Sequence, residues 1–355
     1  MPIQKVDVST FIALSGSYPV FDVRSPSEYA HAHIPGAFSL PLFSDEQRKE
    51  IGTAYKQVSR EDAIKIGLKY FGPELNNYLA QADKITAKQT EKKVLVHCWR
   101  GGMRSGAMAW LLGFCGYEVV LLEGGYKAYR NEVLKRLQLP FKFNVLGGFT
   151  GSGKTEVLQF LKKQQPVIDL EQLAAHKGSA FGGLGMQEQP SQEYFENMLL
   201  HELSPYFQLS GDGLFKQNQP IWIENESQRI GLISLPNAFY AQIQQGRLIS
   251  LDIPFLPRLN YINIHYGRFK QKELISSVLR IQKKLGGLDA KNAINFLLED
   301  NTLSCFEILL KYYDKCYLEA HEKSQRKRES VLTDIIDPEI NAQKILSYIN
   351  LHRDE

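Results

Sequence analysis

One short stretch, GFTGSGKT at residues 148–155, restricts the fold more than any other feature of the chain. It follows FKFNVLGG, an apolar run typical of a buried strand, and a helical pattern begins near Lys154. The spacing G-x-x-x-x-G-K-[ST] places backbone N–H groups, a lysine and a hydroxyl where a strand passes into a helix, which is the setting of a phosphate-binding loop. We therefore expect these residues to bind a di- or triphosphate: Gly148, Thr150, Gly151, Ser152, Gly153, Lys154 and Thr155.

The carboxylate that would accompany such a loop is less clearly marked. Asp169 ends the strand-like run PVIDL, and Glu224 and Glu226 follow PIWI. Each of the three could bind a metal ion or act as an acid or base, and the sequence does not choose among them. A Mg²⁺ ion is therefore one expectation, and no tightly bound organic cofactor is expected.

Strand-like and helix-like patterns alternate along both halves of the chain. The pattern is typical of parallel α/β sheets, whose sites form at the carboxyl ends of the strands. A change near Pro140 divides the chain into a first domain at residues 1–138 and a phosphate-loop domain at 139–355, the latter with a largely helical C-terminal part. The runs that favour strands are PVFDVRSP, AFSLPLF, KKVLVHC, EVVLLEGG, FKFNVLGG, PVIDL, PIWIE and RLISLDI.

A second loop, HCWRGGMRSG from His97, places a cysteine directly after a strand-like run and before a helix. Nearby cations and a helix N-terminus both stabilise a thiolate, so Cys98 is a candidate nucleophile with Arg100 and Arg104 beside it. Asp22 ends another predicted strand, and we expect it to brace this site by hydrogen bonds. The alternative is a buried structural cysteine, which would not need the glycines and arginines. The remaining loop residues expected to hold an anion are Trp99, Gly101, Gly102, Met103 and Ser105.

The first half of the chain resembles the rhodanese fold over roughly residues 1–135. The resemblance depends on FDVRSPSEYAHAHIPGAFSLPLF, the Cys98 loop and LLEGGYKAYR, which occur in the expected order. Five residues separate Cys98 from Arg104, one more than is usual in sulfur-transferring rhodaneses. The longer loop is similar to that of cysteine phosphatases, which suits a tetrahedral, phosphate-like group.

Charge and composition permit a polyanionic partner. The chain has a net charge of +3, and residues 258–284 hold seven Lys or Arg against one acid, with aromatic residues between them. Such a surface could follow an RNA backbone, although a plain solvated helix face explains it equally well. The candidate RNA-binding residues are Arg258, Arg268, Lys270, Arg280, Lys283 and Lys284.

Four scattered cysteines give no disulfide or zinc pattern, which suits a reducing compartment. No apolar run approaches the length of a membrane helix, and the first residues lack the pattern of a signal peptide. We therefore expect a cytoplasmic protein with no membrane partner.

The whole chain resembles the bacterial tRNA 2-selenouridine synthase family. The matching blocks are GTAYKQ, CWRGGMRS, GGYKAYR, GGFTGSGKTEVL, IDLEQLAAHKGSAFG, QPSQEYFE and IWIENESQRIG. The resemblance implies that sulfur at carbon 2 of the wobble 2-thiouridine of tRNA is replaced by selenium. It also implies geranyl diphosphate and selenophosphate as co-substrates, with the phosphate loop holding the first and the Cys98 loop the second. An enzyme that supplies selenophosphate is an implied partner.

Two other functions remain open from the sequence. One is a cysteine-dependent phosphatase or sulfurtransferase, fused to a regulatory NTPase and acting on small molecules. The other is a non-catalytic, nucleotide-gated RNA-binding protein. The first predicts nucleotide turnover without RNA, and the second predicts that Cys98 is dispensable.

Overall fold

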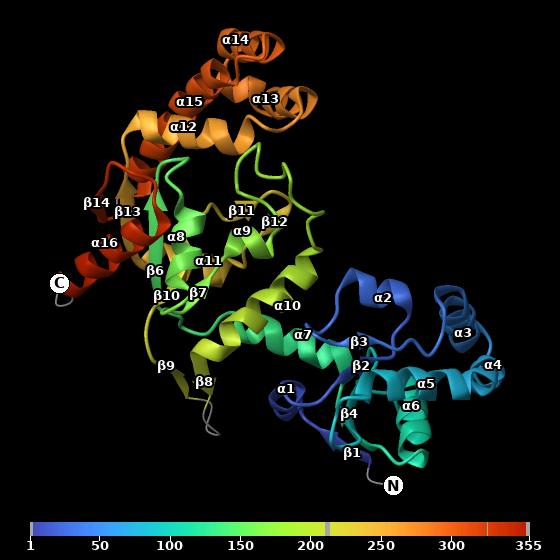
Figure 1. The fold of residues 1–355 in the computed structure, drawn as a ribbon. Coiled ribbons are helices and arrows are strands. Elements are labelled where there is room, and N and C mark those ends of the chain that lie inside the picture. Colours follow the sequence, from blue (N-terminus) through green and yellow to red (C-terminus); the bar gives the residue numbers. More distant parts are fainter. Residues whose placement is uncertain (1–2, 210–213, 325, 353–355) are drawn as a thin grey trace. The chain divides into compact units, whose positions relative to one another are not determined.

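The computed structural model describes residues 3–209, 214–324 and 326–352. The chain forms two compact units, which are described separately (Figure 1). The first holds the residues up to Arg136 together with 196–200, and the second holds the rest. The division after Arg136 falls two residues before the expected boundary. Among the described residues, no helix combines the length and apolar content required to cross a membrane.

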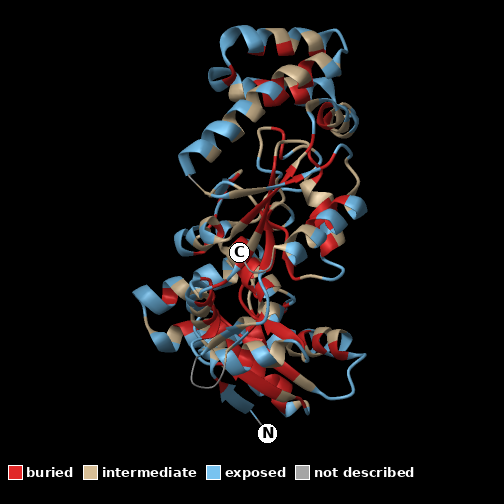
Figure 2. Ribbon diagram, turned by 90° about the vertical axis from the view of Figure 1, so that its left-hand side faces the viewer, coloured by how far each residue is buried: buried red, intermediate tan, exposed pale blue. Residues whose placement is uncertain are grey.

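The first unit contains a five-stranded sheet in which all neighbouring strands are parallel, in the order β1-β5-β4-β2-β3. The central strands β4 and β5 read KVLVH and EVVLL, and they are buried along nearly their whole length (Figure 2). Continuous apolar runs are expected where helices cover both faces of a parallel sheet. The strands are β1 (Ile3–Val6), β2 (Val20–Asp22), β3 (Phe38–Ser39), β4 (Lys93–His97) and β5 (Glu118–Leu122).

Helices flank this sheet, with α1 and α7 on one side and α5 and α6 on the other (Figure 1). The core between α6 and the sheet includes Phe21, Val96, Met108 and Leu112. The helices are α1 (Val8–Ser15), α2 (Pro26–His31), α3 (Asp45–Gln57), α4 (Arg60–Phe71), α5 (Leu75–Thr86), α6 (Met103–Phe114) and α7 (Gly125–Arg136), with a 3₁₀ turn η1 (Gly72–Glu74). The predicted helix after Cys98 is thus confirmed, beginning at Met103.

The second unit contains another five-stranded parallel sheet, in the order β14-β13-β6-β10-β7. Strand β6 is central and leads directly into the phosphate loop. The strands are β6 (Phe143–Gly148), β7 (Val167–Ile168), β10 (Ile221–Glu224), β13 (Arg247–Asp252) and β14 (Arg328–Leu332). Two short antiparallel pairs accompany the sheet, β8 (Phe207–Leu209) with β9 (Phe215–Gln217), and β11 (Arg229–Ile230) with β12 (Ile233–Ser234). The α/β fold class is therefore confirmed in both units.

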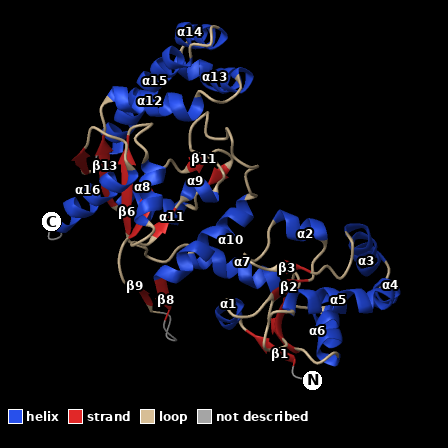
Figure 3. Ribbon diagram, viewed as in Figure 1, coloured by secondary structure: helices blue, strands red, loops and turns tan. Residues whose placement is uncertain are grey.

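The C-terminal part is largely helical, as predicted (Figure 3). One exception is the edge strand β14, which begins at Arg328, near the end of the basic run at residues 321–330. The helices of the second unit are α8 (Lys154–Leu161), α9 (Leu170–Leu173), α11 (Asn237–Gln245), α12 (Phe255–Tyr266), α13 (Gln271–Leu285), α14 (Gly287–Leu298), α15 (Thr302–Ser324) and α16 (Pro338–Leu351). Helix α10 (Gln192–Leu203) contains residues of both units, and a 3₁₀ turn η2 (Ser204–Tyr206) follows it.

Helices α12 to α15 share an apolar core of their own, which includes Leu259, Val278, Ala293 and Phe306. Phe181, from the glycine-rich loop after α9, packs into the same core. The helical spacing of Leu274, Val278, Ile281 and Leu285 in the sequence predicts one apolar face. On α13, Leu274, Val278 and Leu285 are buried and Ile281 is half-buried, so this face is confirmed.

Arg258 ties α12 to the phosphate loop and is not a surface residue. Only 3% of it is exposed, and its guanidinium forms two hydrogen bonds of 2.8 and 2.7 Å with the Asp314 carboxylate. It also donates to the carbonyl oxygens of Thr150 and Ile253, at 3.1 and 3.0 Å. The prediction that Arg258 contacts RNA is therefore wrong, because its donors are used inside the protein.

Breaking this bridge should destabilise the second unit. We expect Arg258→Met to lower the free energy of unfolding by about 3 kcal/mol, because the Asp314 carboxylate loses its partner in a largely buried position. Urea unfolding followed by tryptophan fluorescence would measure the loss. The matched control is Arg280→Met, because Arg280 is exposed and makes a single 3.3 Å bond to a carbonyl. Equal losses in both variants would contradict this role of Arg258.

Candidate functional site

The Cys98 thiol lies at the N-terminal end of helix α6. Only 3% of the residue is exposed, and its Sγ lies 3.2 Å from the Ser105 hydroxyl oxygen and accepts the Gly102 N–H at 3.3 Å. The unpaired N–H groups of a helix N-terminus favour negative charge, so this position suits an anionic group. Of the predicted loop residues, Gly102 and Ser105 therefore contact the thiol itself.

The turn from β5 into α7, residues 123–127, contacts the cysteine loop through its backbone. The N–H of Tyr126 donates to the Cys98 carbonyl at 2.8 Å, and the N–H of Lys127 donates to the Trp99 carbonyl at 3.0 Å. At Gly125, φ is +60°, and a Cβ atom there would lie 2.4 Å from the Cys98 carbonyl oxygen. At Gly101, φ is +66°, and a Cβ atom would lie 2.6 Å from the Leu122 carbonyl oxygen. Both glycines are needed because the two backbones touch.

The two arginines of the loop differ in their surroundings. Arg104 donates from Nη1 to Glu28 Oε2 at 2.7 Å, whereas Arg100 is exposed. Trp99 and Met103 are also exposed, and the Trp99 ring lies 5.8 Å from the Tyr126 ring. Arg104 is thus held in place, and Arg100 projects from the loop surface.

Glu28 is a site residue that the sequence reasoning missed. Burial raises its pKa, but Arg104 outweighs this effect by hydrogen bonding and charge and, with the Ser25 N–H and Arg48, lowers the pKa to about 2. The carboxylate is therefore ionised at any physiological pH. Glu28 is difficult to identify from the sequence, because it lies 76 residues before Arg104, in the first turn of a helix that the sequence suggests is exposed.

Asp22 supports the Cys98 loop indirectly, through Arg24 and Tyr126. Its carboxylate is completely buried and pairs with Arg24, which also donates to the Ala32 carbonyl at 2.7 Å and covers the Tyr126 ring at 3.7 Å. Burial raises the pKa of Asp22, but attraction to His97, which is charged only at acid pH, and the hydrogen bonds and charge of Arg24 together hold it below its usual value. The bracing role agrees with this geometry, because a buried, paired carboxylate has no exposed oxygen to offer a substrate.

His97 is neutral. Burial lowers its pKa to about 4, although Asp22, 3.7 Å from Nε2, opposes this shift. Its ring nitrogens make no hydrogen bond with the described residues. An uncharged imidazole adds no positive charge beside Cys98, so His97 does not activate the thiol electrostatically.

The phosphate loop has the predicted strand–loop–helix form between β6 and α8. Gly148, Gly151 and Gly153 have φ of +141°, +83° and +69°, a conformation that glycine tolerates best. Lys154 is half-buried and donates from Nζ to the carbonyl oxygens of Gly148 and Phe149, at 3.0 and 3.3 Å. The lysine therefore bridges the start of the loop.

Among the acidic residues near this loop, Glu171 is the one that contacts Thr155. The Thr155 hydroxyl donates to Glu171 Oε2 at 2.9 Å. Sequence reasoning named Asp169 instead, two residues earlier, but Asp169 caps α9 by accepting the Gln172 N–H at 2.7 Å. Nothing in the spacing distinguishes the two carboxylates before the start of α9 is known.

The other two predicted carboxylates, those of buried Glu224 and half-buried Glu226, favour their protonated forms. Burial, and then the Asp169 carboxylate, raise the pKa of Glu224 well above its usual value, and its Oε2 accepts the Leu170 N–H at 3.0 Å. Burial, and then Glu171, raise the pKa of Glu226 to about 8. Across the described residues, no group of three or more His, Cys, Asp or Glu is arranged to hold a metal ion.

The remaining RNA candidates lie on or next to α13. Arg268, Lys270, Lys283 and Lys284 are exposed, as is Arg280, whose Nη1 reaches the Ala180 carbonyl at 3.3 Å. The structure thus places five of the six predicted residues at the surface and removes Arg258 from the set.

The Glu28–Arg104 pair gives a pH-dependent prediction. A carboxylate whose pKa is lowered on folding stabilises the protein above its unfolded value, here 4.5, and loses this contribution as the pH falls towards 2. We therefore expect Glu28→Gln to be less stable than the wild type from pH 5 upwards, with the difference shrinking below about pH 4.5. Urea unfolding at several pH values tests this, with exposed Glu61→Gln as the control. A gap between wild type and Glu28→Gln that stays constant down to pH 3 would refute it.

Comparison with known proteins agrees with this arrangement of loops. A family described as the tRNA 2-selenouridine synthase AAA domain matches residues 141–342, and the rhodanese-like domain family matches residues 8–132. A tRNA 2-selenouridine synthase of Bdellovibrio bacteriovorus is 33% identical, covering 86% of this chain and 89% of the relative. That of Hydrogenovibrio crunogenus is 35% identical over 76% of each chain. The chain belongs to the tRNA 2-selenouridine synthase family.

Proposed function

We propose that this chain is an enzyme that replaces sulfur by selenium at carbon 2 of the wobble 2-thiouridine of tRNA. One observation carries the proposal: a single chain of this family forms two loops that each lie between a buried strand and the N-terminus of a helix, a position that suits an anion. One loop holds the buried Cys98, and the other holds Lys154. A two-step exchange with two anionic co-substrates gives each loop one substrate, and membership of the family favours this reaction over a phosphatase fused to an NTPase.

In the first step, the phosphate loop holds geranyl diphosphate. The tRNA sulfur attacks carbon 1 of the geranyl group, and the carbon–oxygen bond breaks with its electron pair leaving on diphosphate. The loop N–H groups and Lys154 stabilise the charge that develops on this leaving group. The sulfur, now alkylated, becomes a better leaving group from carbon 2.

The residues beside this loop fit a Mg²⁺ ion bound together with a diphosphate. Mg²⁺ is usually held by one or two carboxylates, a hydroxyl and phosphate oxygens. Thr155 and Glu171, 2.9 Å apart, supply the hydroxyl and the carboxylate. Such an ion would neutralise charge on the diphosphate.

In the second step, the Cys98 loop handles selenophosphate. Its tetrahedral anion suits the five-residue spacing between Cys98 and Arg104, and the arginines offset its charge. Selenium bonds to carbon 2, the carbon–sulfur bond breaks to release geranylthiol, and water takes the phosphoryl group as phosphate. Cys98 assists the delivery of the selenium, which stays at its selenide oxidation level throughout. An enzyme that produces selenophosphate is the expected partner.

The substrate tRNA requires a cationic surface. Arg268, Lys270, Arg280, Lys283 and Lys284 supply one around α13, and the phosphodiester backbone is the group they would contact. Because phosphate contacts position an RNA without reading its sequence, this surface would orient the tRNA rather than select it.

Nucleoside mass spectrometry tests the proposal. The protein is incubated with 2-thiouridine tRNA, geranyl diphosphate and selenophosphate, and we expect the wild type to make 2-selenouridine. Lys154→Ala should reduce the S-geranylated nucleoside at least about 100-fold, because it removes a preorganised charge at the leaving group. Cys98→Ser should accumulate that nucleoside and make no 2-selenouridine.

The matched controls are Lys162→Ala, which removes an ion-paired lysine after α8, and Cys115→Ser, which removes a thiol beyond α6. Both should keep wild-type product levels. Unchanged nucleosides together with consumption of ATP or GTP would instead support the phosphatase or sulfurtransferase linked to an NTPase.

A further inference from the structure

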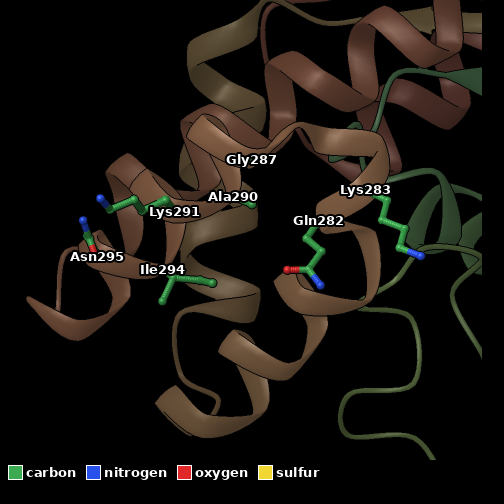
Figure 4. Close-up of a pocket in the computed structure, with 7 residues that line it drawn as sticks. All are labelled: Gln282, Lys283, Gly287, Ala290, Lys291, Ile294 and Asn295. Atoms are coloured by element: carbon green, nitrogen blue, oxygen red, sulfur yellow. The ribbon is translucent and has the colours of Figure 1, made fainter.

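A groove separates the end of α13 from α14, and nothing in the two loops accounts for it. Its volume is about 480 Å³, and Figure 4 shows Gln282 and Lys283 on one side with Lys291 and Asn295 on the other. All four side chains are exposed. Gly287 lines the turn between the helices, where no bulky side chain narrows the opening.

The charge of the chain is concentrated on this helical hairpin. Residues 268–295 contain seven Lys or Arg and two acids, a surplus of five in a chain whose total is only +3. The rest of the protein is therefore slightly acidic. The basic residues are Arg268, Lys270, Lys272, Arg280, Lys283, Lys284 and Lys291, and the acids are Glu273 and Asp289.

The lysines at the groove are not neutralised. Within the described part of the chain, Lys283 and Lys291 form no ion pair, whereas surface lysines such as Lys162 and Lys311 pair with glutamates. Lysine clusters without acidic partners repel one another, and this cost is recovered when a polyanion binds. The groove is thus complementary to a negatively charged ligand.

Most large apolar residues of both helices are buried or half-buried, and the exposed Leu279, Leu288 and Leu298 do not line the groove. Leu274, Val278 and Leu285 of α13 and Ala293 and Leu297 of α14 are buried in the core of the helical part. Of the side chains that line the groove, only Ile294 is large and apolar. A peptide normally requires apolar anchors, whereas a sugar-phosphate chain requires cations and amides.

We propose that the groove between α13 and α14 binds the phosphodiester backbone of the substrate tRNA. Lys283 and Lys291 flank the groove and point outward from it (Figure 4), so they neutralise phosphates on either side of it, and the amides of Gln282 and Asn295 donate to phosphate or ribose oxygens. The inference rests on the proposed function and extends it, because it assigns to α14 residues a role that the basic pattern of α13 alone did not reveal.

The test is the salt dependence of tRNA binding by the full chain. Fluorescence anisotropy with labelled 2-thiouridine tRNA gives Kd between 50 and 300 mM KCl for the wild type and for Lys283→Gln/Lys291→Gln. We expect Kd to rise at least about tenfold at physiological salt and the slope of log K against log salt to fall by about 2, because two phosphates are no longer neutralised by lysine. Lys283→Arg/Lys291→Arg should restore both values.

The control is Lys162→Gln/Lys311→Gln, which removes the same charge from lysines paired with glutamates and should leave the slope unchanged. Equal slopes for the wild type and the groove variant, with tight binding in both, would overturn the proposal that the groove binds tRNA and would leave the proposed function intact. Absence of tRNA binding by the wild type would overturn both. A labelled polyglutamate peptide that binds the wild type more tightly than tRNA, and loses affinity in the groove variant, would replace RNA by an acidic protein.

Discussion

The orientation of the Cys98 thiol depends on a contact between two backbones. The Tyr126 N–H holds the Cys98 carbonyl, and Gly125 lies so close that no side chain fits beside it. Because the Cys98 carbonyl faces the turn from β5 into α7, the thiol lies at the start of α6, where the Gly102 N–H donates to the sulfur. The buried Asp22–Arg24 pair also holds the turn from β5 into α7, since Arg24 covers the Tyr126 ring.

The phosphate loop is supported in a different way. Its glycines adopt backbone conformations that favour N–H groups pointing into the loop, and Arg258 holds the Thr150 carbonyl from α12. Carboxylates follow on the neighbouring strands, and those of Glu224 and Glu226 favour their protonated forms. Burial also raises the pKa of Glu171, and its carboxylate contacts Thr155, at the position where a metal-bound diphosphate would need it. Each unit therefore builds its loop on the same strand-to-helix plan but supports it with different chemistry.

Sequence patterns predicted what depends on neighbouring residues. The buried strands β4 and β6, the loops that follow them and the apolar face of α13 were all expected, because their periodicity and glycine spacing are local. Two of the edge strands, β1 and β14, were missed, since each buries little beyond one valine, Val6 and Val331. Glu28 and Glu171 were missed because their partners are set by the fold. Arg258 was assigned to RNA because it belongs to a basic stretch, while its partner Asp314 lies 56 residues away.

The division of labour between the two loops is tested most directly by supplying the product of the first step. Lys154→Ala and Cys98→Ser would each receive tRNA whose wobble base is already S-geranyl-2-thiouridine, together with selenophosphate, and 2-selenouridine would be measured by mass spectrometry. We expect Lys154→Ala to form it at close to the wild-type rate, because the phosphate loop has no further task, and Cys98→Ser to form none. Failure of Lys154→Ala on this substrate, or normal product with Cys98→Ser, would contradict the assignment of one step to each loop.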